Sequence, residues 1–134
     1  HRTPCPSSSF STAFSAYSAT LGNPFHDSVT CDEAGCAKPN PQFFAFNKGR
    51  QSASGYKQSE ILHVAQSQHH DIGVAKELGY TTCWIERRQG QQGFGGTPEP
   101  KVLTKPDFHF SSLKELADAV DAELAVGIQT ASAA

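Results

Sequence analysis

The chain has 134 residues, of which 37% are hydrophobic, and its 11 basic and 13 acidic side chains give a formal net charge of −2 at pH 7. This length suits one domain with a hydrophobic core. The slight negative charge supplies no broad positive field for nucleic acid, and no apolar stretch approaches the roughly 20 residues that span a membrane. We therefore expect neither nucleic acid nor a membrane as a partner.

The cysteines suggest a reducing compartment. Cys83 lies in an apolar run typical of a buried strand, and four cysteines are too few for a disulfide scaffold. The first residues carry no apolar signal-peptide core, so we expect free thiols and a cytoplasmic protein. The spacing of Cys31 and Cys36, without a second close pair, does not suit structural zinc. The alternative is a secreted protein with Cys31 paired to Cys36 or Cys5 to Cys83.

The amino-terminal part is predicted to be mainly helical. Apolar residues recur at helical intervals over residues 9–21, behind serines suited to capping. Residues 27–31 are a weak strand candidate. Asn40 can cap a helix whose first position suits Pro41, and this helix continues to about residue 53.

The centre of the chain predicts a parallel crossover. Residues 61–65 and 81–85 are apolar, as in strands covered on both faces, and residues 71–79 form a short helical pattern between them. A strand, a helix and a strand in so few residues indicate a right-handed crossover. Gln66 to Asp71 would then lie at the carboxyl end of a strand, where open α/β sheets bind ligands.

The carboxy-terminal part is predicted to begin with a long Gly-, Gln- and Pro-rich loop over residues 86–106, which lacks the Lys-Ser or Lys-Thr of a phosphate-binding loop. An edge strand at 106–110 follows. Ser112 and Glu115 form a capping-box pattern before an apolar stripe expected to dock on the sheet. We expect an α/β domain over residues 1–126, with a partial doubly wound, Rossmann-like parallel sheet flanked by helices, and a flexible tail at 127–134.

Two polar residues are candidates for chemistry. Lys38 precedes a proline between two predicted elements, and Asp71 lies at a turn from strand to helix. A lysine at such a crevice can neutralise a carboxylate nucleophile and an anionic substrate, and an aspartate can hold the lysine. The alternative is that Lys38 is a solvated surface residue and Asp71 merely a helix cap.

The segment GCAKPNPQFFAF (35–46) resembles the third motif of the haloacid dehalogenase (HAD) superfamily. The segment ILHVAQSQHHDIGVAKELGYTTCWIERR (61–88) is similar to the fourth motif with its following helix and strand, in the form of fungal haloacid dehalogenase-like proteins, and PDFHFSSLKEL (106–116) is similar to the family's usual ending. This resemblance implies a hydrolase with a small anionic substrate and a covalent intermediate on an aspartate nucleophile.

The resemblance also implies roles for individual residues. Lys38 would balance the charge of the nucleophile, and Asp71 would position the lysine or water. Thr3 falls near the family's second motif, which binds the anionic group of the substrate, although Pro4 departs from that motif. Gln66 and Ser67 stand in the loop of the fourth motif and are the other substrate-binding candidates.

The nucleophile itself is missing from the matching segments. Neither Asp27 nor Asp32 stands in an Asp-x-x-Gly-Thr context, and the chain starts at His1 and contains no methionine. We therefore expect the chain to carry only the later part of the core domain and to be inactive alone. A missing amino-terminal segment or a second chain would complete the sheet. The competing function is a noncatalytic binding protein that reuses the half-fold.

Gln66 stands at a position that is relevant to magnesium binding. Magnesium-dependent phosphatases of the superfamily usually carry a carboxylate five positions before the residue matching Asp71, and a neutral amide is a weaker magnesium ligand. This favours the metal-free dehalogenase branch, so we expect no metal and no cofactor. The less favoured alternative is a metal site formed by His63, His69, His70 and Asp71.

Overall fold

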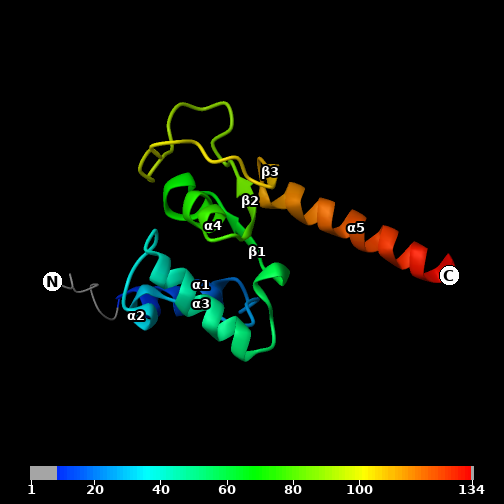
Figure 1. Cartoon of the computed structure of the whole chain (residues 1–134), viewed down its shortest axis with the longest axis horizontal. Coiled ribbons are helices and arrows are strands. Elements are labelled where there is room, and N and C mark those ends of the chain that lie inside the picture. Colours follow the sequence, from blue (N-terminus) through cyan, green and yellow to red (C-terminus); the bar gives the residue numbers. More distant parts are fainter. Residues whose placement is uncertain (1–8, 134) are drawn as a thin grey trace. The chain divides into compact units, whose positions relative to one another are not determined.

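The computed structural model describes residues 9–133. Thr3 and Cys5 lie outside the described residues. The chain divides into two compact units, His1–Ile61 and Leu62–Ala134, and each is described by itself (Figure 1). Whether the two units act as one domain stays a prediction.

The first unit is helical, with α1 at Ser9–Thr20, α2 at Cys31–Ala34, α3 at Pro41–Ala53 and a 3₁₀ turn at Gln58–Glu60. The two longer helices confirm the predicted ones. Asn40 caps α3, because its side-chain oxygen accepts a hydrogen bond of 2.9 Å from the backbone of Gln42.

The strand candidate at residues 27–31 was wrong. The backbone before Thr30 is irregular, and α2 begins at Cys31. Thr30 and Glu33 form a reciprocal capping box, in which the Glu33 carboxylate accepts a 2.8 Å hydrogen bond from the Thr30 N–H. These local hydrogen bonds outweigh the β-propensity of the preceding residues.

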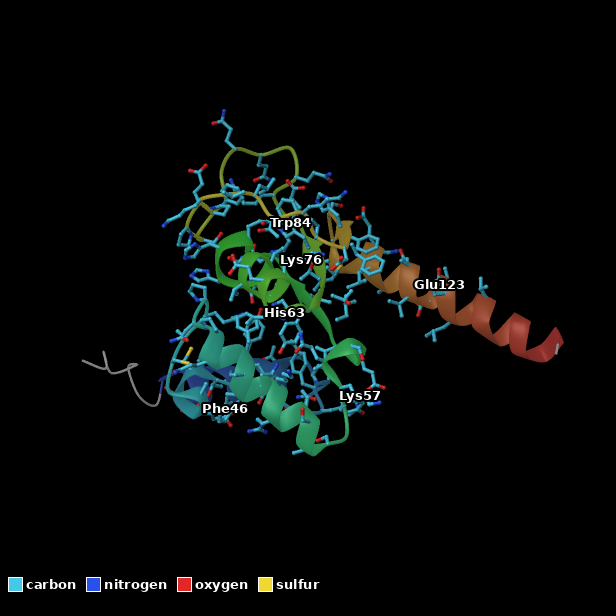
Figure 2. The ribbon with its side chains drawn as sticks, viewed as in Figure 1. Phe46, Lys57, His63, Lys76, Trp84 and Glu123 are labelled. Carbon is cyan, nitrogen blue, oxygen red and sulfur yellow. The ribbon has the colours of Figure 1, made fainter. Side chains whose placement is uncertain are left out.

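The second unit contains a parallel sheet with strands β1 at Leu62–Ala65, β2 at Thr81–Ile85 and β3 at Phe108–Phe110, in the order β1-β2-β3. The α/β fold class and the predicted parallel pairing of the two central segments are confirmed. Figure 2 marks His63 on β1 and Trp84 on β2.

The crossover from β1 to β2 starts with a turn of π-helix, η2, at Gln68–Ile72 and continues as α4 at Gly73–Glu77. Ser67, not Asp71, is its N-cap, because the Ser67 hydroxyl accepts a hydrogen bond of 3.0 Å from the His70 N–H. Gly79, with a φ of 86°, follows the helix in the left-handed region that glycine favours. Asp71 thus lies inside the π turn, and the helix-cap alternative for it is wrong.

The central strand β2 forms the core of the second unit. Its last four residues are buried, with Cys83 at 0% and Trp84 at 7% exposure. Because side chains alternate along a strand, these two residues point to opposite faces of the sheet. Burial on both faces explains why the sequence of β2 is apolar almost throughout.

The last helix, α5, spans Leu113–Ala133 and extends away from β3 (Figure 1). Near its start, Leu116 and Ala119 line an open apolar groove together with Phe110 of β3. Much of the predicted stripe remains exposed, and Leu124 is 61% accessible. The helical backbone continues into the segment expected to be a flexible tail, whose mobility stays a prediction.

Two further expectations concern thiols and membranes. Cys36 and Cys83 are free thiols, so neither disulfide required by the secreted alternative is present. Burial raises the pKa of the Cys83 thiol. Within residues 9–133, none of the helices has the length and apolar character needed to cross a membrane.

Candidate functional site

Lys38 lies in the first unit, in a turn closed by a 3.0 Å hydrogen bond from the Asn40 N–H to the Ala37 carbonyl. The Lys38–Pro39 peptide bond is cis. The side chain is half-buried, and its ammonium group lies 6.0 Å from the centre of the Phe43 ring, at the limit of a cation–π interaction. Lys38 is therefore not a fully solvated surface lysine.

The other predicted residues follow β1 in the second unit, as expected from the crossover. Ser67 is buried, and its hydroxyl lies 3.2 Å from Nδ1 of His70. Gln66 is exposed. Its backbone carbonyl accepts a 2.9 Å hydrogen bond from the indole N–H of Trp84. The end of β1 is thus fixed to β2 by a side-chain hydrogen bond rather than by another backbone hydrogen bond of the sheet.

Asp71 is only 5% exposed, and its carboxylate lies 3.1 Å from Nε2 of His63 on β1. A buried carboxylate is stable only when hydrogen-bonded or paired. The π turn brings Asp71 back over the strand, so His63 supplies one such partner. A protonated His63 would make the contact charge-assisted.

The pairing of His63 with Asp71 was missed from the sequence. The available signal was that His63 is the one polar residue in an otherwise apolar strand. His69 lies against His70 at 4.9 Å between ring centres, in an edge-to-face arrangement. Within residues 9–133, no group of three or more His, Cys, Asp or Glu side chains has the geometry of a metal site, so the four-residue metal alternative is not supported by the described geometry.

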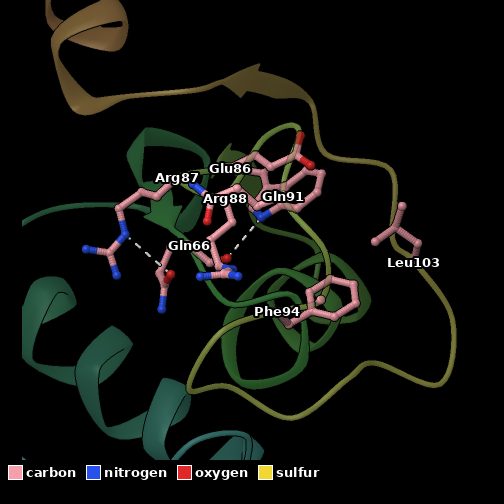
Figure 3. Close-up of a pocket in the computed structure, with 9 residues that line it drawn as sticks. Gln66, Glu86, Arg87, Arg88, Gln91, Phe94 and Leu103 are labelled. Carbon is pink, nitrogen blue, oxygen red and sulfur yellow. Dashed lines mark hydrogen bonds between the residues drawn. The ribbon is translucent and has the colours of Figure 1, made fainter.

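A second set of polar contacts lies at the ends of β2 and β3. The Trp84 ring stacks on His109 with 4.6 Å between ring centres, and Nε2 of His109 lies 2.7 Å from the Glu86 carboxylate. Beyond Glu86, the Arg87 Nε donates a 3.3 Å hydrogen bond to the Gln66 side chain (Figure 3). Trp84, His109 and Arg87 were not among the residues predicted to form a site.

The structure therefore places Asp71, Gln66 and Ser67 together at the carboxyl end of β1. Lys38 belongs to the other unit, so its expected contact with Asp71 stays a prediction. The chemistry available at the described edge is that of a buried carboxylate, an imidazole and a guanidinium. Such groups can orient a cation or water and bind an anion.

No protein-family model matches the chain. A curated glyceraldehyde 3-phosphate phosphatase of Methanocaldococcus jannaschii is 32% identical over 96 residues, which make up 72% of this chain and 38% of that protein. The chain thus spans well under half the length of this relative.

Solved structures give a consistent likeness. A HAD phosphatase from Thermococcus onnurineus has a TM-score of 0.59 and 25% identity, over 81% of this chain and 45% of that chain. The L-2-haloacid dehalogenase of Xanthobacter autotrophicus has a TM-score of 0.63 over 84% of this chain and 51% of that chain; at 20% identity it shows a likeness of fold alone.

Proposed function

The chain belongs to the haloacid dehalogenase superfamily, and from this membership we propose that it serves in the hydrolysis of a small anionic substrate by an aspartate nucleophile. We assign the nucleophile to a further segment or to a second chain. A carboxylate oxygen of the nucleophile attacks the substrate, the leaving group departs, and water then cleaves the covalent ester or acyl phosphate.

The single observation that carries the proposal is the buried Asp71 carboxylate beyond the carboxyl end of β1, 3.1 Å from His63. A carboxylate held there can accept a hydrogen bond from the Lys38 ammonium or from attacking water. Lys38 would in turn neutralise charge on the nucleophile and substrate, an effect that grows as the transition state forms. Gln66, Ser67 and Thr3 are the proposed contacts of the anionic group.

We consider two classes of substrate. Gln66 in place of a carboxylate favours a 2-haloacid and a metal-free mechanism. A phosphate ester is the second candidate, because the curated relative at 32% identity is a phosphatase. The noncatalytic alternative is a binding protein that uses the same edge without turnover.

The test uses the complete gene product and the 134-residue chain, each assayed with L-2-chloropropionate and p-nitrophenyl phosphate. We expect the complete protein to hydrolyse one of them and the chain alone to hydrolyse neither. Lys38→Ala should lower kcat by at least about a hundredfold with little change in stability. Lys48→Ala removes an exposed lysine from α3 and should retain full activity.

Three outcomes would contradict the assignment. Turnover by the chain alone that disappears in Lys38→Ala would place the nucleophile within these residues. Full activity of the complete protein carrying Lys38→Ala would remove the lysine from the mechanism. A complete, folded protein that hydrolyses neither class would favour the noncatalytic binding protein.

A further inference from the structure

A small pocket lies beneath the long loop that follows β2, in the second unit. Its volume is about 190 Å³, below the roughly 300–1,000 Å³ of pockets for drug-sized ligands. The pocket borders the candidate site only through Gln66. The pocket thus shares Gln66 with the candidate site, and its other lining residues have no role in the proposed hydrolysis.

Two guanidinium groups give this pocket a positive character. Nε of Arg87 donates a hydrogen bond of 3.3 Å to the Gln66 side chain, and Nη2 of Arg88 donates one of 3.0 Å to the Gln92 carbonyl. Among residues 9–133, no hydrogen bond engages the two terminal nitrogens of Arg87 or the Nε and Nη1 of Arg88. Each arginine is held in place by one contact and keeps donors for a ligand.

The carboxylate that lines the pocket is already engaged. Glu86 lies 2.7 Å from Nε2 of His109, and that imidazole stacks on Trp84. The negative charge of Glu86 is therefore directed at His109. An incoming oxyanion would be attracted by two guanidinium groups and repelled by one carboxylate, which already pairs with His109.

The shape of the loop depends on glycine. Gly95 has a φ of 68°, and a β-carbon there would lie 3.0 Å from Cδ of Arg88. A larger residue would be strained by the backbone conformation and would push against the arginine. The glycine-rich segment thus brings the loop against Arg88 at Gly95.

Apart from Gln91 and Gly93, the rest of the lining is an apolar wall. Phe94 and Leu103 lie across the pocket from Arg87, as Figure 3 shows, and the nearly buried ring of Trp84 lines it as well. A bare inorganic anion would leave this wall without contacts. A ligand with a flat apolar body and one oxyanion would use both parts of the pocket.

We propose that the pocket lined by Arg87, Arg88, Trp84 and Phe94 binds a small aromatic carboxylate or phosphate monoester. The shared chemistry is a planar apolar body that carries one oxyanion for the arginine pair. Bidentate guanidinium contacts favour such groups. The pocket shares Gln66 with the candidate site, but binding there needs no nucleophile and no residue of the first unit, so it can be tested apart from the proposed hydrolysis.

The single tryptophan of the chain provides the measurement. The 134-residue chain is titrated with phenyl phosphate, benzoate, inorganic phosphate and phenol while Trp84 fluorescence is followed at a fixed excitation near the red edge of its absorption. We expect saturable changes with phenyl phosphate or benzoate, at an affinity at least about tenfold above those of phenol and inorganic phosphate. Whichever of the two binds more tightly identifies the anion class.

Variants distinguish binding in this pocket from a general attraction between the ligand and positive charges of the protein. Arg87→Ala and Arg88→Ala should each weaken binding at least about tenfold, and Arg88→Lys should restore only part of the loss because the planar fork is gone. Lys101→Ala removes one positive charge from the same loop outside the pocket and should bind as the parent does. Circular dichroism checks that each variant is folded.

The proposal fails if no ligand gives a saturable change, if phenol binds as tightly as phenyl phosphate and benzoate, or if Lys101→Ala weakens binding as much as the arginine variants. Backbone amide shifts from nuclear magnetic resonance provide a second check, because perturbations must centre on residues 84–95. Benzoate has no bond for a hydrolase of this type to cleave, so a failure here leaves the hydrolase proposal untouched, and the reverse also holds.

Discussion

The crossover between β1 and β2 and the terminal helix α5 both carry apolar residues at helical spacing, yet they differ in burial. In the crossover, Ile72 and Ala75 are fully buried, whereas Leu113 and Leu124 of α5 are 63% and 61% exposed. The crossover is short and is joined at both ends to paired strands, which forces it back onto the sheet. By contrast, α5 leaves β3 and extends away from the sheet (Figure 1). An apolar stripe thus predicts a helix, while its connections decide how far the stripe is buried.

The crossover and α5 also differ in the hydrogen bonds at their starts. The side chain of Gln68, at the start of the crossover, donates to the Thr104 carbonyl at 3.2 Å and accepts from the Thr104 N–H at 3.0 Å. This pair of bonds fastens the end of the long loop to the crossover. The hydrogen bonds made by the residues at the start of α5 are local: Ser111 donates to Glu115, and Ser112 accepts from the same residue.

The largest expected effect is that of truncating the crossover core. Ile72→Ala should lower the free energy of unfolding by about 2–5 kcal/mol, because it leaves a cavity at a fully buried position. Leu124→Ala removes a comparable side chain from the exposed part of α5 and should change it by less than about 0.5 kcal/mol. Urea unfolding followed by circular dichroism measures both. Equal losses in the two variants would show that α5 is as well packed as the crossover.

A smaller effect is expected at the helix caps. Ser67→Ala should cost about 1 kcal/mol, because the buried hydroxyl caps the π turn and its loss leaves the His70 N–H without that acceptor. Ser112→Ala, at the start of α5, should cost less because water can reach the freed Glu115 N–H. The same urea titrations give both values. A larger loss at Ser112 would reverse the ranking of the two regions.

The smallest effect concerns a carboxylate between the crossover and β3. The Lys76 ammonium and the Thr82 N–H lower the pKa of Asp107 to about 2 from an ordinary value of 3.8. The folded pKa lies below the unfolded one, so the carboxylate stabilises the fold above about pH 4, and this contribution is lost as the pH falls to about 2.

Asp107→Asn should therefore flatten the part of the stability–pH curve between about pH 4 and pH 2. Asp118→Asn, which breaks an exposed ion pair with Lys114 on α5, serves as the control and should leave this part of the curve nearly unchanged. Unfolding free energies at three pH values suffice. A curve that keeps its slope in Asp107→Asn would assign the pH dependence to other groups.

Much of the fold could be predicted because its signals are local. Asn40 followed by Pro41 marks the start of α3, and the two apolar runs mark β1 and β2. The strand expected at residues 27–31 failed because the capping box of Thr30 and Glu33 was not recognised. Local hydrogen bonds of that kind can be found in a sequence if every Thr or Ser is checked against the residue three positions later.

The candidate site was only partly predictable for the same reason. The position of Asp71 after β1 follows from the crossover, whereas its contact with His63 depends on a π turn that hydrophobic periodicity does not reveal. The pocket at Arg87 and Arg88 depends on a loop whose path is set by glycine conformations and by contacts distant in sequence. Composition identifies such a segment as a loop but not which side chains it brings together.

Because of the π turn, the contact between Asp71 and His63 also depends on the number of residues between β1 and α4. The closing bonds of this turn join residues five apart, from the Ile72 N–H to the Ser67 carbonyl at 3.0 Å and from the Gly73 N–H to Gln68. One residue fewer would allow an ordinary α turn and rotate the following side chains by about 100° about the helix axis. A homologue one residue shorter here could therefore keep an aspartate and a histidine at the aligned positions and still lose their contact. Insertions and deletions between β1 and α4 are thus as informative as the identity of the residues when the superfamily is divided into types.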